Sequence, residues 1–279
     1  MPSPRFTLSF QTALPDDYQK DAAFRSLLDA LRDLGFWGVE LNVGDPHDCR
    51  AETIGSFLAG FGLEVSMLAT GLTAKRLGLS LSHPEEDARR RSVDKCREMI
   101  EWAAAVRAGL IIGFLKGGVS PDPAGSRARL RKSLEQIVPF ASERSTPILV
   151  EATNRYESSV ANTLEETVAL LEGLDVAHAR VLPDTFHMNI EEADMFGSLS
   201  RYRARFISLH LSDNNRRFPG FGSIDFRRVI HHLRDIGYEG RLAIEGNPGG
   251  DVVEDLRQSM KCLGPLLARL RAPSGFVES

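Results

Sequence analysis

Short apolar runs alternate with longer amphipathic stretches along most of this chain. The runs that predict strands are 6–10, 38–42, 65–70, 110–115, 147–151, 180–184, 206–210 and 241–245. Between them, apolar residues recur at the spacing of a helix face. Strands that alternate with helices form a parallel sheet, and eight such repeats favour closure into a barrel over an open sheet. We therefore predict an α/β fold, a single (β/α)8 barrel (TIM barrel) spanning residues 1–279.

Helix boundaries are also marked in the sequence. The predicted helices are 27–35, 53–62, 83–106, 129–143, 163–174, 191–202, 225–237 and 252–272. Thr163, followed by Glu166 three residues later, predicts a capping box, and Asp225 predicts an N-cap. Gly237 should end its helix. The helix 83–106 should be the longest, and Pro139 predicts a kink or a break in the helix 129–143.

The last four predicted strands each end on a side chain that can bind a metal. These side chains are Glu151, Asp184, His210 and Glu245. A βα-barrel gathers the carboxyl ends of its strands on one face, where active sites are built. Each residue alone is more often a cap, a turn or a core residue. Acidic side chains are rarely buried without a partner. A bound cation would explain why all four of these strands end on a side chain that can bind a metal. Three carboxylates and one imidazole suit Mn²⁺, Mg²⁺ or Co²⁺, with Zn²⁺ left open.

Three further polar residues follow these strands closely. Glu157, His187 and Arg216 fall in predicted loops directly after the strands, where groups that contact a substrate belong. In the simpler interpretation, Glu157 caps the next helix and Arg216 is solvated. The long polar segment 213–225 is a candidate lid over the site, or else an ordinary connection.

Composition narrows the classes of partner. The net charge of −4 gives no overall basic footprint, so we predict no nucleic-acid partner. Cys49, Cys96 and Cys262 form no C-x-x-C pair, which indicates reduced thiols and a cytoplasmic protein. The first residues show no signal peptide, and no apolar run approaches the roughly 20 residues that cross a bilayer. A membrane partner is therefore not expected.

Four segments resemble a known group of enzymes. They read VEATNRYESSVANT, LPDTFHMNIEE, HLSDNNRRFPGFGSIDFRRVIHHLRDIGYEG and AIEGNP. They are similar to the xylose isomerase-like barrel superfamily of sugar isomerases and epimerases, most of all to ketose 3-epimerases of the D-tagatose, D-psicose and L-ribulose group. The resemblance is strong over residues 147–248 and only fold-level over 1–146. One departure is the segment LKGG (115–118), which leaves the identity of the sugar open.

The resemblance implies a site, a cofactor and a reaction. The metal ligands would be Glu151, Asp184, His210 and Glu245, with Mn²⁺ or Co²⁺ as the ion. Of these, Glu151 and Glu245 would also move the proton. The sugar contacts would be Glu157, His187 and Arg216. The implied reaction is C3 epimerisation of a ketose or ketose phosphate through a metal-stabilised cis-enediolate. Family members are often dimers or tetramers, so a homo-oligomer is expected.

Other functions share parts of this pattern. An aldose–ketose isomerase of the hydroxypyruvate or inosose type would use the same enediolate. An endonuclease IV-like repair nuclease needs histidines at the ends of strands three and four, which 65–70 and 110–115 lack. A Schiff-base aldolase stays open because Lys116 closes the fourth predicted strand, although a snorkelling rim lysine is the simpler interpretation. A sugar-binding protein without activity is disfavoured, because all seven site positions are intact.

Overall fold

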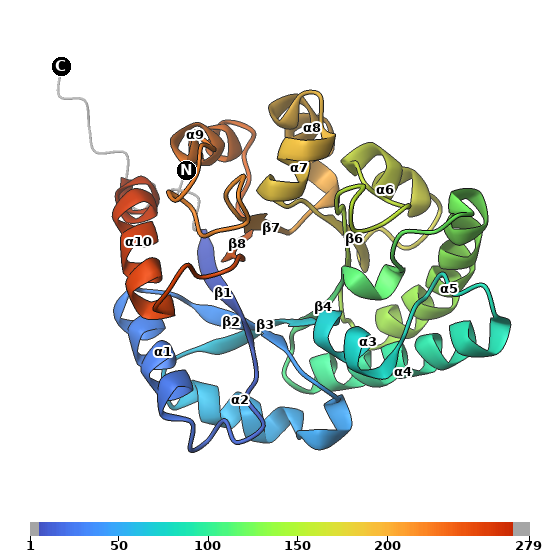
Figure 1. Ribbon diagram of the computed structural model, residues 1–279, viewed down its shortest axis with the longest axis horizontal. Coiled ribbons are helices and arrows are strands. Elements are labelled where there is room, and N and C mark those ends of the chain that lie inside the picture. Colours follow the sequence, from blue (N-terminus) through green and yellow to red (C-terminus); the bar gives the residue numbers. More distant parts are fainter. Residues whose placement is uncertain (1–5, 270–279) are drawn as a thin grey trace.

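The computed structural model describes residues 6–269, and in it eight parallel strands form a barrel surrounded by helices (Figure 1). The strands are β1 (Thr7–Ala13), β2 (Gly38–Asn42), β3 (Glu64–Ala69), β4 (Gly109–Ile112), β5 (Ile148–Glu151), β6 (Ala179–Leu182), β7 (Ser208–Leu211) and β8 (Arg241–Ile244). The hydrogen-bonded order is β6-β5-β4-β3-β2-β1-β8-β7, and a bridge between Asp184 and His210 spans the seam between β6 and β7. The predicted (β/α)8 fold is confirmed.

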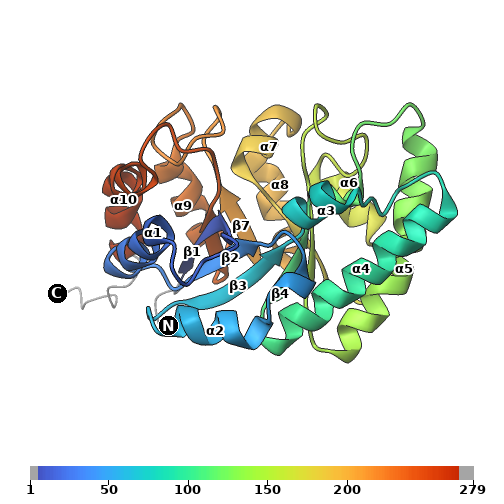
Figure 2. The ribbon, with the colours of Figure 1, turned by 60° about the horizontal axis from the view of Figure 1, so that its bottom comes forward.

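Within the described residues 6–269, ten α-helices connect and cover these strands. They are α1 (Ala22–Asp33), α2 (Ala51–Ala59), α3 (Gly71–Leu77), α4 (Glu86–Ala105), α5 (Pro123–Glu143), α6 (Leu164–Leu170), α7 (Thr185–Glu191), α8 (Met195–Arg201), α9 (Phe226–Asp235) and α10 (Val252–Arg269). Figure 2 shows helices such as α2 and α4 on the outside of the strands. Within residues 6–269, no helix is both long and apolar enough to cross a membrane. Parts of the expected N-terminus (1–5) and of the last predicted helix (270–272) lie outside the described residues.

Two short helices follow strands where the sequence predicted none. The helix α3 lies in the polar stretch after β3, and α7 starts directly after Asp184. His187 was expected in a loop, and that prediction is wrong because it lies in α7. The Asp184 carboxylate accepts hydrogen bonds from the N–H groups of Phe186 and His187, as an N-cap does. A helix of seven residues is too short to show a clear apolar period.

Helix α5 differs from the sequence predictions in three respects. It has 21 residues against 20 in α4, so the helix 83–106 is not the longest. It also starts earlier than expected, with Asp122 as N-cap, and it continues through Pro139 to Glu143 without a break. Burial of neighbours such as Ile137 and Ala141 in the core offsets the hydrogen bond that proline cannot donate.

Several strand ends also differ from the prediction, and three of them bear on the candidate site residues. The strand β4 ends at Ile112, and Lys116 belongs to the short 3₁₀ helix that follows rather than to the strand. His210 lies inside β7, and Asp184 lies beyond the end of β6. The predicted caps are correct, since Thr163 and Asp225 accept hydrogen bonds from the N–H groups of Glu166 and Arg228.

The alternation of side chains along each strand separates two buried layers. One small apolar cluster, made of Met67, Ala69, Ile111, Leu149 and Leu182, belongs to β3–β6. A much larger cluster joins the other side of the strands to the helices. Because side chains alternate along a strand, Leu149 and Glu151 share the inward face of β5. The apolar layer therefore lies beneath the carboxyl ends, where polar side chains take over.

The core between helices and sheet gives a first prediction. Leu134 of α5 is fully buried, and Leu77 of α3 is partly exposed at 38%. We expect Leu134→Ala to lower the free energy of unfolding by about 2–5 kcal/mol, because it removes buried methyl groups and leaves a cavity. Leu77→Ala, the matched control, should change it by about 0.5 kcal/mol or less. Urea denaturation measures both values, and equal losses in the two variants would contradict this packing.

Candidate metal centre

The four predicted ligands lie together at the carboxyl ends of β5–β8. Each offers one ligand atom, and these atoms all lie within 4.8 Å of one another in the set Glu151, Asp184, His210 and Glu245. Within residues 6–269, this is the single group of three or more Asp, Glu, His or Cys side chains that could hold a metal ion. The sequence predicted that these four side chains would meet at one face of the barrel, and the structure confirms that they do. The role of these residues as ligands stays a prediction.

The atoms at the centre of this group are close to one another but lack hydrogen bonds. His210 Nδ1 lies 2.6 Å from Glu245 Oε2 and 3.5 Å from Glu151 Oε1. All three atoms are buried, and none has a hydrogen-bond partner. A buried polar atom without a partner costs about 1–3 kcal/mol, so native proteins rarely keep three together. Two carboxylate oxygens and an imidazole nitrogen this close together fit a cation placed between them, and the oxygen-rich donor set fits a divalent one.

One charged neighbour of this group, on β2, is not among the residues predicted from the sequence. Glu40 of β2 is fully buried, and its Oε2 lies 2.9 Å from His210 Nε2. Burial by itself lowers the pKa of His210, but the charges of Glu40 and Glu245 outweigh it and hold that pKa well above its usual value. The signal in the sequence was an acidic residue within the otherwise apolar run GVELN.

Arg216 contacts two of the predicted ligands. Its Nη1 lies 2.6 Å from Asp184 Oδ2, and its Nη2 lies 2.7 Å from Glu245 Oε1. Burial raises the pKa of Glu245, but Arg216 and His210 together bring it well below its usual range. Glu245 is therefore ionised at neutral pH. Arg216 also lines the cavity, so its guanidinium can balance the carboxylates and still face a ligand.

The loop that carries Arg216 is organised around one buried carboxylate. Asp213 accepts hydrogen bonds from four backbone N–H groups, those of Asn214, Gly220, Gly222 and Ile224, at 2.8–3.0 Å. Arg216 itself adopts a left-handed backbone with φ of 60°. Such strain persists only where the surroundings enforce it. This anchoring favours an ordinary fixed connection over a lid for the segment 213–225.

Loss of this anchor should weaken the whole loop. We expect Asp213→Ala to lower the free energy of unfolding by about 2–4 kcal/mol, because several N–H groups lose a charged acceptor. The exposed Asp235→Ala should change it by about 0.5 kcal/mol or less. Thermal or urea unfolding gives the comparison. A stability change for Asp213→Ala as small as that of the control would show that the four hydrogen bonds do not hold the loop.

His187 and Glu157 lie beside Glu151 rather than within the ligand group. His187 Nε2 is 3.8 Å from Glu151 Oε1, and His187 Nδ1 is 4.0 Å from Glu157 Oε1. The backbone N–H of Asn154 donates to His187 Nδ1 at 3.2 Å. An imidazole nitrogen that accepts a hydrogen bond carries no proton, so neutral His187 bears its hydrogen on Nε2. That N–H faces the carboxylate side of the cavity.

Lys116 is fully buried and bound to the main chain. Its ammonium donates to the carbonyl oxygens of Glu151 at 2.7 Å and of Ala161 at 2.9 Å. Burial lowers the pKa of Lys116 to about 7. The two hydrogen bonds tie the end of β5 to the far end of the loop that carries Glu157. Because its ammonium is bound to two carbonyl oxygens, Lys116 is poorly placed to act as the nucleophile of a Schiff-base aldolase.

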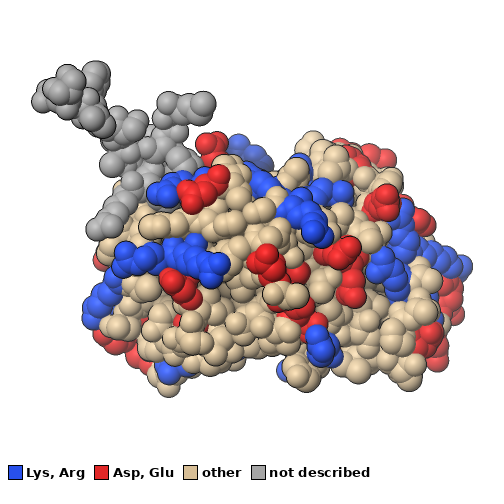
Figure 3. Space-filling model, turned by 90° about the horizontal axis from the view of Figure 1, so that it is seen from above, with Lys and Arg blue, Asp and Glu red and all other residues tan. Residues whose placement is uncertain are grey.

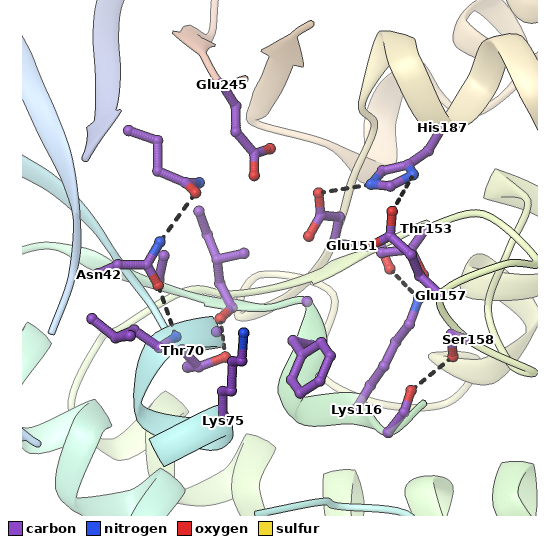
Figure 4. Close-up of a pocket in the computed structure, with 18 of the residues that line it drawn as sticks. Asn42, Thr70, Lys75, Lys116, Glu151, Thr153, Glu157, Ser158, His187 and Glu245 are labelled. Carbon is purple, nitrogen blue, oxygen red and sulfur yellow. Dashed lines mark hydrogen bonds and ion pairs between the residues drawn. The ribbon is translucent and has the colours of Figure 1, made fainter. Parts of the chain in front are cut away.

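A cavity of about 350 Å³ opens beside the ligand group. Figure 4 shows Glu151, Glu245 and His187 on one side, and Asn42, Thr70 and Lys75 on the other. Ligand cavities in proteins commonly start at about 300 Å³. The second wall comes from the ends of β1–β4, and sequence analysis missed it because single polar residues after a strand carry no distinctive pattern. A polar wall opposite a charged centre suits a ligand with several hydroxyl groups.

Comparison with known proteins agrees with this geometry. A family model described as xylose isomerase-like TIM barrel matches residues 28–265. The ketose 3-epimerase of Arthrobacter globiformis is 29% identical over 232 residues, which cover 82% of this chain and 79% of that protein. The D-psicose 3-epimerase of Enterocloster bolteae is 35% identical over 127 residues, 46% of this chain and 42% of that protein. A solved L-ribulose 3-epimerase has a TM-score of 0.80 at 23% identity, and the match covers 95% of this chain and 96% of that one.

Proposed function

Because this chain belongs to the xylose isomerase-like TIM barrel family, we propose that it is a metal-dependent ketose 3-epimerase. The observation that carries the proposal is the convergence of Glu151, Asp184, His210 and Glu245 beside a polar cavity. Its relatives include proteins named as ketose, psicose and ribulose 3-epimerases and one named as a 3-dehydro-D-guloside 4-epimerase, all of them isomerases. The alternatives of a nuclease and an aldolase gain no support from the site.

The proposed cofactor is one divalent cation held by the four converging side chains. Such an ion acts as a Lewis acid that polarises a carbonyl oxygen and so favours loss of a proton from the neighbouring carbon. We propose Mn²⁺, and Co²⁺, Mg²⁺ or Zn²⁺ remain alternatives, since a set of carboxylates and one imidazole accepts all four. The unpartnered atoms of Glu151, His210 and Glu245 support this role.

In this proposal Glu151 and Glu245 move the proton. They come from β5 and β8 and both face the cavity (Figure 4). One carboxylate removes the proton from C3, and the electron pair of the C–H bond moves toward the carbonyl oxygen to give an enediolate. The other side chain, which must be protonated as a carboxylic acid, delivers its proton to the opposite face of C3 and becomes a carboxylate, which restores the carbonyl and inverts the centre.

In this proposal His187, Arg216 and Glu157 bind the sugar, and the first two stabilise the negative charge that develops on its oxygen. His187 presents its Nε2–H beside Glu151, and Arg216 presents its guanidinium beside Glu245. Fixed donors near a developing oxyanion often provide the largest share of catalysis. Glu157, about half exposed at the cavity wall, is placed to accept a hydrogen bond from a more distant hydroxyl.

Product analysis in heavy water tests this function. We would incubate the enzyme with Mn²⁺ and D-tagatose, D-psicose or L-ribulose, each with and without a terminal phosphate, and follow the products by NMR. We expect interconversion of C3 epimers, with solvent deuterium appearing at C3. An aldose product with deuterium at its C2 would instead identify an aldose–ketose isomerase of the hydroxypyruvate or inosose type. If the enzyme converts none of these sugars, the result counts against the proposed function.

Four broader proposals concern the oligomeric state, the domain organisation, the location and the partner of this protein. We propose a homo-oligomer, a dimer or tetramer, since the resemblance to the ketose 3-epimerases implies one; light scattering would show its mass. A single domain over 1–279 is supported by one family model that spans 28–265. A cytoplasmic location is supported by three free cysteines.

On the face drawn in Figure 3, basic and acidic side chains are interspersed, which supports a small-molecule partner over a nucleic acid.

A further inference from the structure

One buried carboxylate reaches the metal centre from across the barrel. Glu40 lies on β2 and His210 on β7, and in the sheet these strands are separated by β1 and β8. Both side chains are fully buried, and Glu40 Oε2 lies 2.9 Å from His210 Nε2. A buried carboxylate costs several kcal/mol unless a partner offsets the loss of water, and the His210 ring nitrogen at 2.9 Å is the partner that Glu40 has in this structure. Gln11 adds a longer contact of 3.4 Å to the same oxygen.

The two nitrogens of His210 face different groups. Nε2 faces Glu40, whereas Nδ1 faces Glu245 at 2.6 Å and Glu151 at 3.5 Å. A hydrogen bond from Nε2–H to a carboxylate leaves the Nδ1 lone pair free in the neutral imidazole. Histidines that bind metals commonly donate their other ring N–H to a carboxylate or a carbonyl, which fixes the ring and its tautomer.

We propose that Glu40 is a positioning residue of the metal centre, which holds His210 with its hydrogen on Nε2 and its Nδ1 lone pair directed at the cation. This inference rests on the proposed function, because it assumes a cation among Glu151, Asp184, His210 and Glu245. It extends the site into the first half of the chain, away from the strands β5–β8 that carry the four predicted ligands. Glu40 does not contact the substrate cavity, so its effect acts through His210.

A purely structural role for Glu40 is the competing explanation. The charge of Glu40 also acts on Arg241 of β8, whose Nη1 donates to the carbonyl of Ser66 at 2.9 Å. If Glu40 only balanced Arg241, its replacement would change stability but not the affinity for a metal or the tautomer of His210. The contact with His210 is direct, and no ion pair joins Glu40 to Arg241 among the described residues.

Metal affinity separates the two explanations without any substrate. We would strip the protein of metal and titrate it with Mn²⁺ by isothermal calorimetry, comparing the unchanged protein with Glu40→Gln. We expect the dissociation constant to rise about 10–100-fold, the usual effect of removing such a partner of a ligand. Glu64→Gln is the matched control, an exposed carboxylate on the neighbouring strand β3, and it should leave the constant unchanged. Equal Mn²⁺ affinity in folded Glu40→Gln and the unchanged protein would overturn the proposal.

A second measurement decides the matter even if Glu40→Gln does not fold. Nitrogen-15 histidine spectra of the unchanged protein loaded with Zn²⁺ should show His210 protonated on Nε2 and bound through Nδ1. Protonation on Nδ1 would overturn the proposal. A protein that binds Mn²⁺ and shows the Glu40 effect but epimerises no ketose would refute only the proposed function. A protein that epimerises ketoses, with equal affinity in both variants, would refute only the role of Glu40. Absence of any divalent-cation binding would contradict both.

Discussion

Glu245→Gln should abolish epimerisation while the barrel stays folded. We expect kcat to fall by at least about 10³-fold, because a positioned acid–base group contributes about 10²–10⁴ and an amide cannot accept the proton. The neighbours of Glu245 sharpen this expectation. Burial would favour its neutral form, but Arg216 at 2.7 Å and His210 at 2.6 Å keep its pKa low. At neutral pH the carboxylate is therefore in the form that removes a proton.

The experiment must separate loss of the base from loss of the metal. Glutamine keeps one oxygen that can still reach the cation, so the rate should remain low even when Mn²⁺ is saturating. Glu239→Gln replaces an exposed glutamate just before β8 and should keep kcat within about twofold, as surface substitutions away from special features usually have small effects. Circular dichroism confirms folding of each variant. Full epimerisation by Glu245→Gln, with solvent deuterium at C3, would remove Glu245 from the mechanism.

Removal of divalent cations should abolish activity and lower the melting temperature. A ligand that binds only the folded state stabilises it by about 2.7 kcal/mol when present at 100 times its dissociation constant. The chain should remain folded without the ion, because Arg216 and His210 partly balance the three carboxylates. Dialysis against a chelator, followed by activity and melting measurements, checks this result. Added Mn²⁺ should restore both properties.

The variant Asp184→Asn tests whether the effect of the metal on stability arises at this site. In Asp184→Asn, which weakens one buried ligand, added Mn²⁺ should raise the melting temperature much less than in the unchanged protein. Activity that survives complete chelation would contradict the metal-dependent account. Trapping of a substrate on Lys116 by borohydride would then point to the aldolase alternative, although that lysine is bound to two carbonyl groups.

The sequence was informative where one local signal decided the structure. Apolar runs in the sequence locate all eight strands, and the side-chain types at or near their ends point to the group Glu151, Asp184, His210 and Glu245. This worked because a barrel places every strand end on one face. The cap residues Thr163 and Asp225 were predicted correctly for a similar reason, since a side chain that accepts a nearby N–H acts locally.

Features that depend on distant contacts could not be predicted. The contact between Glu40 and His210 joins residues 170 positions apart, and the run GVELN alone does not show which face of the strand holds the glutamate. Lys116 seemed to close a strand because Phe114 and Leu115 are apolar, yet the chain turns at Gly113. Pro139 remains helical because tertiary packing outweighs its local preference.

The central claim is that one divalent cation sits among Glu151, Asp184, His210 and Glu245. Anomalous scattering from crystals grown with Mn²⁺, measured near the manganese absorption edge, tests it directly. We expect a single strong peak within bonding distance of one atom from each of these four side chains, including Nδ1 of His210. A peak elsewhere in the molecule, or no peak from a protein that still epimerises ketoses, would contradict it.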